Sequence, residues 1–254
     1  MKLLLSGIVA IFISGLVFWD FKNDREKTTG APPYLVTEDP PNDSGWGQYA
    51  YLKDWKRPEG PIKVGLQAGH WKNDEVPDEL SRLKGNTGSA SNGITEWEVN
   101  LKIAQETAKI LQTKGIIAEI LPTTIPVDYW ADVFVAVHAD GNTDRSVSGF
   151  KAAVPRRDMT GNNKKLLEAM ETAYEKNTRL EKDPNVSRNM RGYYAFGWWR
   201  FDHAIHPMTP AIILETGFLT NYSDRLTIVN RPEKAAAGIA EGIVEFLKAT
   251  NFKL

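Results

Sequence analysis

Short apolar runs of strand length alternate with longer stretches of helical period from residue 62 to the end of the chain. The pattern predicts five strands, over residues 62–68, 116–121, 133–138, 150–154 and 211–215. It predicts three helices, over residues 96–114, 162–177 and 233–249. Strands separated by helices are typical of an α/β layer fold with a mixed, largely parallel sheet. Ligands bind such sheets at the carboxyl ends of the strands, so those ends are where functional residues are expected.

Length and charge narrow the class of protein. A chain of 254 residues with 42% hydrophobic content is long enough for one sizeable domain with one main core. The formal net charge is -1 and the pI is near 6.5, which gives no broad positive field. We therefore expect no nucleic-acid partner.

The N-terminal part of the chain differs from the rest. Residues 3–19 form an uncharged apolar run that is near the short end of the length needed to cross a bilayer. No small-residue cleavage site follows, so residues 1–19 are interpreted as a membrane anchor in preference to a removed signal peptide. Residues 20–61 are rich in Pro, Gly, Asp and Lys, show no sustained period and read as a linker. This arrangement predicts a domain over residues 62–254 outside the cytoplasmic membrane, in the periplasm or at the cell surface.

Residues able to bind a metal or carry a proton stand at the ends of three predicted strands. The run KVGLQAGH ends at His70, DVFVAVHAD contains His138 and AIILETGF contains Glu215. The chain has no cysteine, so a metal site could use only histidines and carboxylates. It has only four histidines, which makes two at strand ends informative, although either one alone could be a hydrogen-bonded core residue.

A third ligand can be sought where the helix over residues 96–114 begins. On a helix, Glu96 lies within about 60° of an apolar stripe that faces the sheet, formed by Val99, Ile103 and Ile110. Glu98 lies about 200° away, on the face expected to be solvated, where it could pair with Lys102. An inward carboxylate is costly without a cation or donors nearby, and zinc would supply the cation. The alternative is that Glu96 is a helix-start acid, with Thr95 or Asn92 as the cap.

Four motifs, AGH, GITEWEVNLKIA, FVAVHAD and PAIILETGFLTN, together resemble the zinc-dependent N-acetylmuramoyl-L-alanine amidases of the amidase 3 family. They occur in the family's order and extend over residues 62–254. The resemblance implies an α/β fold with a six-stranded mixed sheet and one zinc ion bound by His70, Glu96 and His138. It implies Glu215 as the catalytic glutamate, and peptidoglycan as substrate, cut between MurNAc and L-alanine. The segment 71–93 is longer and less glycine-rich than is usual in the family, which leaves substrate access and a lid role open.

The implied mechanism assigns separate tasks to the metal and to Glu215. Zinc lowers the pKa of a bound water to about 7 and polarises a carbonyl. Glu215 would take the water proton and pass it to the departing amine, a task for a carboxylate near the metal but not on it.

Other polar and aromatic residues are weaker candidates. His203 and His206 could bind a metal, but Pro207 indicates a loop. The aromatic run 193–201 could stack on sugar or belong to the core. Further candidates are Arg188 and Arg191 for a substrate carboxylate, Asp140 for orienting a ligand, and Asn221 for a turn or helix cap.

Two other functions remain open from the residues alone. The chain could be a non-catalytic cell-wall-binding or morphogenesis protein that keeps the fold. It could also be a metallopeptidase that cuts within the stem peptide. The sequence does not reveal whether a regulatory protein partner exists.

Overall fold

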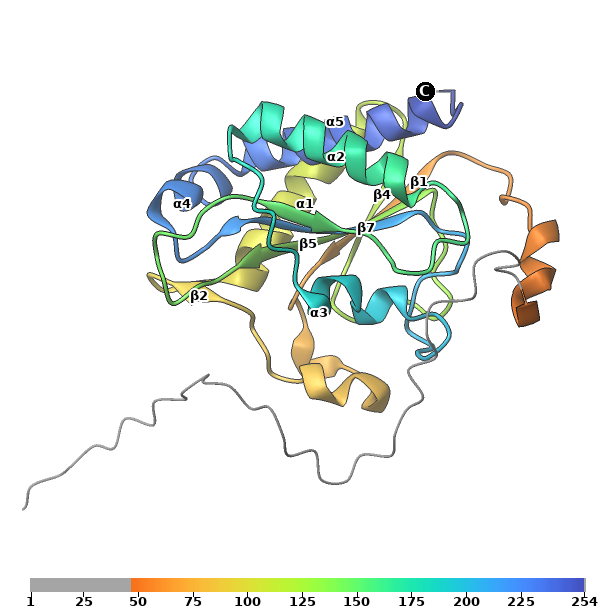
Figure 1. The fold of residues 1–254 in the computed structure, drawn as a ribbon, viewed down its shortest axis with the longest axis horizontal. Helices are drawn as coiled ribbons and strands as arrows, with labels where there is room; N and C mark the ends of the chain where they lie inside the picture. The colour runs from red at the N-terminus through yellow and green to blue at the C-terminus, as the bar shows by residue number, and fades with distance from the viewer. Residues whose placement is uncertain (1–46, 254) are drawn as a thin grey trace, which may run out of the picture. The chain divides into compact units, whose positions relative to one another are not determined.

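The structure, a computed structural model, describes residues 47–253 (Figure 1). Its strands are β1 (Lys63–Ala68), β2 (Ala90–Ser91), β3 (Ile94–Thr95), β4 (Ile117–Leu121), β5 (Val133–Asp140), β6 (Lys151–Ala153) and β7 (Ala211–Phe218). Its α-helices are α1 (Glu96–Gln112), α2 (Asn163–Thr178), α3 (Arg188–Arg191), α4 (Tyr222–Ile228) and α5 (Pro232–Ala249). Four 3-10 helices are η1 (Gly47–Asp54), η2 (Asn73–Glu75), η3 (Asp78–Leu83) and η4 (Tyr194–Phe196).

The main sheet confirms the predicted α/β class and the mixed, largely parallel topology. Its strand order is β4-β1-β5-β7-β6. The first four strands are parallel, and only β6 runs antiparallel, against β7. The small β2-β3 hairpin forms a separate two-stranded sheet.

The expected number of six strands is wrong for the main sheet, which has five strands within residues 47–253. Next to β6, Phe150 makes a single isolated bridge with Lys182, and Asp183 donates its backbone N–H to the Phe150 carbonyl at 2.7 Å. The next residue, Pro184, has no N–H to extend such a ladder. The pairing at this edge therefore stops before a sixth strand can form.

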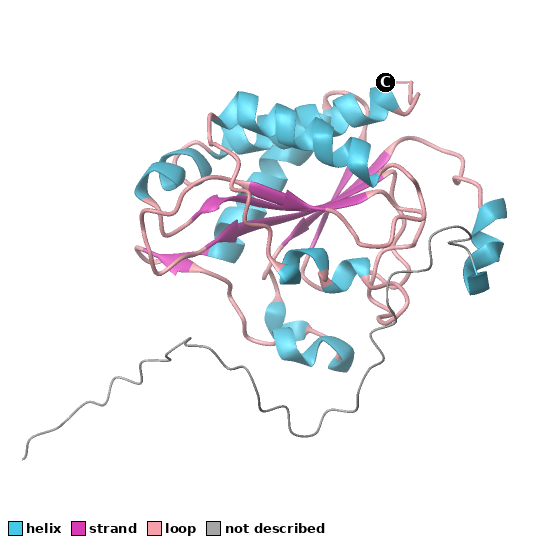
Figure 2. Cartoon of the chain, in the orientation of Figure 1, coloured by secondary structure: helices cyan, strands magenta, loops and turns pink. Residues whose placement is uncertain are grey.

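The two faces of the sheet carry different layers (Figure 2). Odd-numbered positions of β5, from Val133 to Val137, belong to the core cluster that includes the apolar residues of α1, α2 and α5. Phe134 and Ala136 face the opposite side, where they pack with residues of η3, α3 and η4. Since side chains alternate along a strand, His138 continues the face of Phe134 and Ala136.

Of the two segments predicted before the catalytic domain, the structure describes only the last part of the linker. The segment 1–19, predicted to be a membrane anchor, lies outside the described residues. Part of the predicted linker is described, and there η1 forms and Arg57 donates to the carboxylate of Asp132 at 2.6 and 2.9 Å. Within residues 47–253, no helix combines the length and apolar character needed to cross a membrane.

Candidate metal and catalytic site

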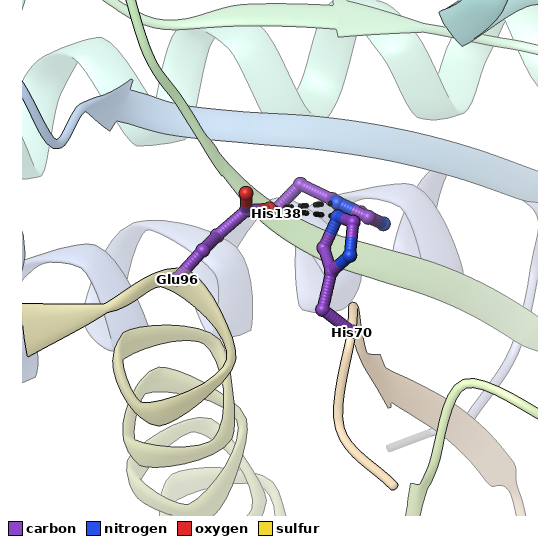
Figure 3. Close-up of side chains that lie close together, drawn as sticks. All are labelled: His70, Glu96 and His138. Atoms are coloured by element: carbon purple, nitrogen blue, oxygen red, sulfur yellow. Dashed lines mark hydrogen bonds and ion pairs between the residues drawn. The ribbon is translucent and has the colours of Figure 1, made fainter. Parts of the chain in front are cut away.

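Three predicted residues meet at the carboxyl end of the sheet (Figure 3). His70 follows β1, His138 lies near the end of β5 and Glu96 is the first residue of α1. Oε1 of Glu96 lies 2.9 Å from Nδ1 of His138 and 3.5 Å from Nε2 of His70. One donor atom from each side chain lies within 4.8 Å of the other two, which is compact enough for all three to contact one cation.

The turn after β1 brings His70 to this position. The Gly69 N–H donates to the Val137 carbonyl at 3.0 Å, so the AGH segment stays against β5 as β1 ends. A Cβ on Gly69 would overlap the ring of His138, so only glycine allows this approach. His70 then adopts a φ of 64°, in the left-handed region that non-glycine residues rarely occupy. The small residue and the unusual backbone conformation together turn the imidazole of His70 toward the other two ligands.

The start of α1 explains why Glu96 and Glu98 have different roles. Glu98 is exposed, as predicted, and its Oε2 accepts from the backbone N–H of Thr95 at 2.9 Å and from its hydroxyl at 2.6 Å. The predicted pair between Glu98 and Lys102 is wrong. Lys102 binds Glu106 at 2.8 Å instead, because Glu98 is engaged by Thr95, the residue that precedes the helix.

Backbone and amide donors surround the buried carboxylate of Glu96. Its Oε2 accepts from the Ser89 N–H at 2.7 Å. Its Oε1 accepts from the Ala139 N–H at 3.2 Å and from the side-chain amide of Asn100 at 3.2 Å. Asn100 also donates to the Gly69 carbonyl at 3.1 Å, so the helix and the β1 turn are linked. These donors fix the direction in which the carboxylate points.

The three residues of the cluster have shifted pKa values. Burial alone would raise the pKa of Glu96, but the hydrogen bond and charge of His138, together with the charge of His70, lower it to about 2. Burial would lower the pKa of His138, but the hydrogen bond and charge of Glu96 outweigh it and raise this pKa. Burial lowers the pKa of His70. The cluster therefore contains an ionised carboxylate at neutral pH.

Glu215 lies on β7 in register with His138, so the two side chains lie on the same face of neighbouring parallel strands. Its Oε2 atom is buried, and within residues 47–253 it has no hydrogen-bond partner. Burial raises the pKa of Glu215 to about 8, with His138 opposing this rise and Glu96 adding to it. A carboxyl group with this pKa can gain or lose a proton near neutral pH.

The cluster of His70, Glu96 and His138 fits a divalent cation. Two imidazoles and one carboxylate are the usual protein ligands of a catalytic zinc ion. The uncompensated Oε2 atom of Glu215 is a second sign that a polar group belongs beside these residues. Across residues 47–253, no second group of three or more metal-ligating side chains comes as close together.

The other predicted candidates have different partners. Nδ1 of His203 lies 2.7 Å from the Ile125 carbonyl, and the ring of His206 lies 5.3 Å from that of Trp55. Neither histidine joins the cluster. Asp140 pairs with Lys151 at 2.6 Å.

The remaining polar candidates lie on two short helices. Arg188 and Arg191 are exposed on α3. Asn221 caps α4, since its side-chain oxygen accepts from the Asp224 N–H at 3.1 Å.

Several residues around the cluster were not recognised in the sequence. Ser89 and Asn86 come from the long segment 71–93 and contact Glu96 and His70. In the sequence Tyr193 is one residue of an aromatic run. In the structure its hydroxyl lies 3.2 Å from Nε2 of His138. The clearest signal was Gln67, a polar residue inside an apolar strand, which is fully buried.

Comparisons with known proteins identify the family of this chain. Residues 64–245 match the family model Amidase_3, described as N-acetylmuramoyl-L-alanine amidase. The curated protein N-acetylmuramoyl-L-alanine amidase LytC of Bacillus subtilis (strain 168) is 25% identical over 176 residues. The match includes 64% of this chain but only 33% of LytC, so the chain spans about a third of the length of that relative.

Solved structures share the fold. The amidase AmiC2 of Nostoc punctiforme has a TM-score of 0.53 at 21% identity, with 75% of this chain and 99% of that chain covered. Ami1 from Mycobacterium smegmatis has a TM-score of 0.54 at 17% identity, with 74% and 97% covered. The match to the family model extends over well more than half of the sequence. The chain therefore belongs to the Amidase_3 family of N-acetylmuramoyl-L-alanine amidases.

Proposed function

We propose that this protein is a zinc-dependent amidase that hydrolyses the bond between N-acetylmuramic acid and L-alanine in peptidoglycan. The observation that carries the proposal is the meeting of His70, Glu96 and His138 at one point. Glu215 lies on the strand next to that of His138, and within residues 47–253 its buried Oε2 atom has no hydrogen-bond partner. Membership of the family and the name of the Bacillus subtilis relative support the choice of bond.

One zinc ion per chain would be held by His70, Glu96 and His138. When bound there, zinc would acidify a water molecule and stabilise negative charge on the oxygen of the scissile carbonyl. The protein's own contribution is to hold the three ligands before the metal arrives. Ser89, Asn100 and the Ala139 N–H do this for Glu96.

Glu215 acts as the proton carrier of the reaction. Its ionised form would accept a proton from the attacking water, and the raised pKa makes that form a stronger base than an ordinary carboxylate. The proton then passes to the amide nitrogen as the bond from carbon to nitrogen breaks. The products are a carboxylate on the lactyl group and a free amine on L-alanine.

The site of action follows from the substrate. Peptidoglycan lies outside the cytoplasmic membrane, so the catalytic domain, residues 62–254, would work in the periplasm or at the cell surface. Residues 1–19 would anchor it to the membrane and 20–61 would be the tether. We expect no nucleic-acid partner, because the net charge of -1 provides no positive field.

The test is incubation of the protein with purified peptidoglycan and zinc, followed by mass spectrometry of the released material. Stem peptides with a free L-alanine amine are the expected product, and the Glu215→Ala variant should release none. Cleavage within the stem would instead identify a metallopeptidase. Zinc binding without any release would identify a non-catalytic wall-binding protein.

A further inference from the structure

A series of hydrogen-bonded polar groups, here called the polar chain, leads away from His138. Nε2 of His138 lies 3.2 Å from the Tyr193 hydroxyl, which donates to Oε1 of Gln67 at 2.7 Å. Nε2 of Gln67 donates to the Thr123 carbonyl at 2.8 Å and to the Tyr194 hydroxyl at 2.6 Å. Gln67 lies on β1 and is fully buried, so water does not compete for its amide.

The direction of each hydrogen bond in this chain can be deduced. The Thr123 carbonyl can only accept, so the Gln67 atom beside it must be the amide nitrogen. The amide oxygen of Gln67 therefore faces Tyr193, and it too can only accept. The single proton of the Tyr193 hydroxyl is used in this bond. Toward His138 the hydroxyl has only lone pairs to offer, so Nε2 of His138 must carry a hydrogen.

A hydrogen on Nε2 determines which nitrogen of His138 is available to a metal. An imidazole that binds a metal is neutral, so with its hydrogen on Nε2 the lone pair that it offers lies on Nδ1. Before a metal binds, Nδ1 donates to Oε1 of the ionised Glu96 at 2.9 Å, and this hydrogen, at the centre of the cluster, is the one that a metal would replace. The hydrogen bonds of the polar chain and the position of the ring therefore both identify Nδ1 as the nitrogen of His138 that would bind the metal.

His70 is held in the opposite arrangement. Its Nδ1 lies 2.9 Å from the Asn86 carbonyl, which can only accept, so Nδ1 carries the hydrogen. The lone pair lies on Nε2, the nitrogen closest to Glu96 at 3.5 Å. Asn86 belongs to the long segment 71–93, which through this carbonyl and the Ser89 N–H supports two of the three ligands.

We propose that Tyr193 and Gln67 are positioning residues that make His138 bind the metal through Nδ1, while the Asn86 carbonyl makes His70 bind through Nε2. The inference rests on the proposed metal site and adds how that site is built. Groups that hydrogen-bond to the outer nitrogen of a ligand histidine fix its tautomer and orientation, and their loss typically weakens metal binding by about 10- to 100-fold.

The first test compares the zinc affinity of variants of the full chain, measured by competition with a chromophoric chelator. Tyr193→Phe removes the acceptor for His138 and should weaken zinc binding by about 10- to 100-fold. Tyr129→Phe is the matched control, because it removes a hydroxyl from a buried tyrosine, which binds Glu119 at 2.5 Å and is remote from the ligands. Equal affinity of the two variants would overturn the role of Tyr193.

The second test needs no variant. Long-range proton-nitrogen correlation spectra of the zinc-loaded protein, labelled with nitrogen-15, distinguish protonated from metal-bound ring nitrogens. The expected spectrum shows His138 with a protonated Nε2 and a metal-bound Nδ1, and His70 with the reverse. Zinc bound to His138 through Nε2 would overturn this inference and leave the proposed function intact. Failure to bind zinc at all would overturn both.

Discussion

Glu96, the first residue of α1, and Glu215, on β7, are carboxyl groups whose pKa values are shifted in opposite directions. The hydrogen bond and charge of His138, together with the charge of His70, lower the pKa of Glu96 to about 2, whereas burial raises that of Glu215 to about 8. A permanently ionised carboxylate suits a metal ligand, and one that titrates near neutral pH suits a proton carrier. The different roles proposed for the two residues follow from these surroundings.

Replacement of Glu215 should separate metal binding from catalysis. Glu215→Gln keeps the shape of the side chain but cannot carry the proton, so hydrolysis should fall by about 100- to 10,000-fold. Zinc content should remain one ion per chain, measured by elemental analysis. Glu245→Gln, an exposed change on α5, is the control. Full activity of Glu215→Gln would contradict the assignment.

Gly69 is the residue whose backbone must approach His138 most closely. In Gly69→Ala the added methyl would overlap the imidazole ring, so His138 must move and zinc affinity should fall at least tenfold. Gly161→Ala is the control, since its φ of 68° is strained for alanine but no atom lies within 4 Å of the added Cβ. It should lower the free energy of unfolding by about 1–2 kcal/mol and leave zinc affinity unchanged. Chelator competition measures the zinc affinity of the two variants. Equal zinc affinities would contradict this role of Gly69.

Sequence patterns identified the cluster residues but few of their neighbours. His70, His138 and Glu215 stood out because polar residues ended apolar strands, and Glu96 because it shared the apolar stripe of a helix. Asn86 and Ser89 could not be found this way. They contribute a backbone carbonyl and a backbone N–H, which any residue type could supply.

At the scale of elements, β6 is the antiparallel edge of the sheet and carries a buried charge network. Lys151 on β6 binds Asp140 at 2.6 Å and Asp183 at 3.1 Å. Asp183 lies in the segment that bridges to Phe150. The network therefore joins β5, β6 and the loop after α2, next to the strand that carries Glu215.

The charge network of Lys151, Asp140 and Asp183 should make the free energy of unfolding depend on pH. Burial would raise the pKa of Asp183, but hydrogen bonds from the Asn185 backbone and from Lys151 outweigh it and lower this pKa. A lowered pKa contributes stability above the unfolded value of about 3.9, which is lost as the pH falls through the folded value. Asp183→Asn should therefore lose less stability than the unmodified chain between pH 6 and pH 3.

Urea unfolding of both proteins at the two pH values measures this difference. Asp74→Asn, an exposed change on η2, should behave like the unmodified chain. If Asp183→Asn and the unmodified chain lost equal stability on acidification, the network would not contribute as described.

Strongly periodic elements were predicted well and short ones were not. Strands β1, β4 and β5 and helices α1, α2 and α5 lie close to their predicted ranges. The helices bury one face, which imposes a helical period, and the central strands β1 and β5 are buried on both faces, which makes them continuous apolar runs. The 3-10 helices and the β2-β3 hairpin are too short to show a period. The expectation of a sixth strand came from the family resemblance. In this chain the pairing next to β6 consists of a single bridge, and it stops at Pro184.

At the scale of the whole molecule, the proposed ligands join three parts of the chain that are far apart in sequence. His70 follows β1, Glu96 begins α1 and His138 lies near the end of β5. A metal that contacts all three exists only in the folded state, so its binding energy adds to the stability of the fold.

Zinc should therefore raise the melting temperature. At a free concentration 100 times its dissociation constant, zinc stabilises the folded state by about 2.7 kcal/mol. For a domain of this size this corresponds to a rise of roughly 5–10 °C. Scanning calorimetry with zinc and with a chelator measures the difference, and His138→Ala should show none. A shift of equal size in that variant would place the zinc elsewhere.

His70, Glu96 and His138 are proposed to bind one zinc ion together. X-ray absorption at the zinc edge of the loaded protein tests this proposal, because the spectrum reports the ligand types around the metal. We expect nitrogen and oxygen ligands at about 2.0–2.2 Å, with the scattering pattern of two imidazoles, and loss of one imidazole in His138→Ala. A spectrum with fewer than two imidazoles, or one that His138→Ala leaves unchanged, would contradict it.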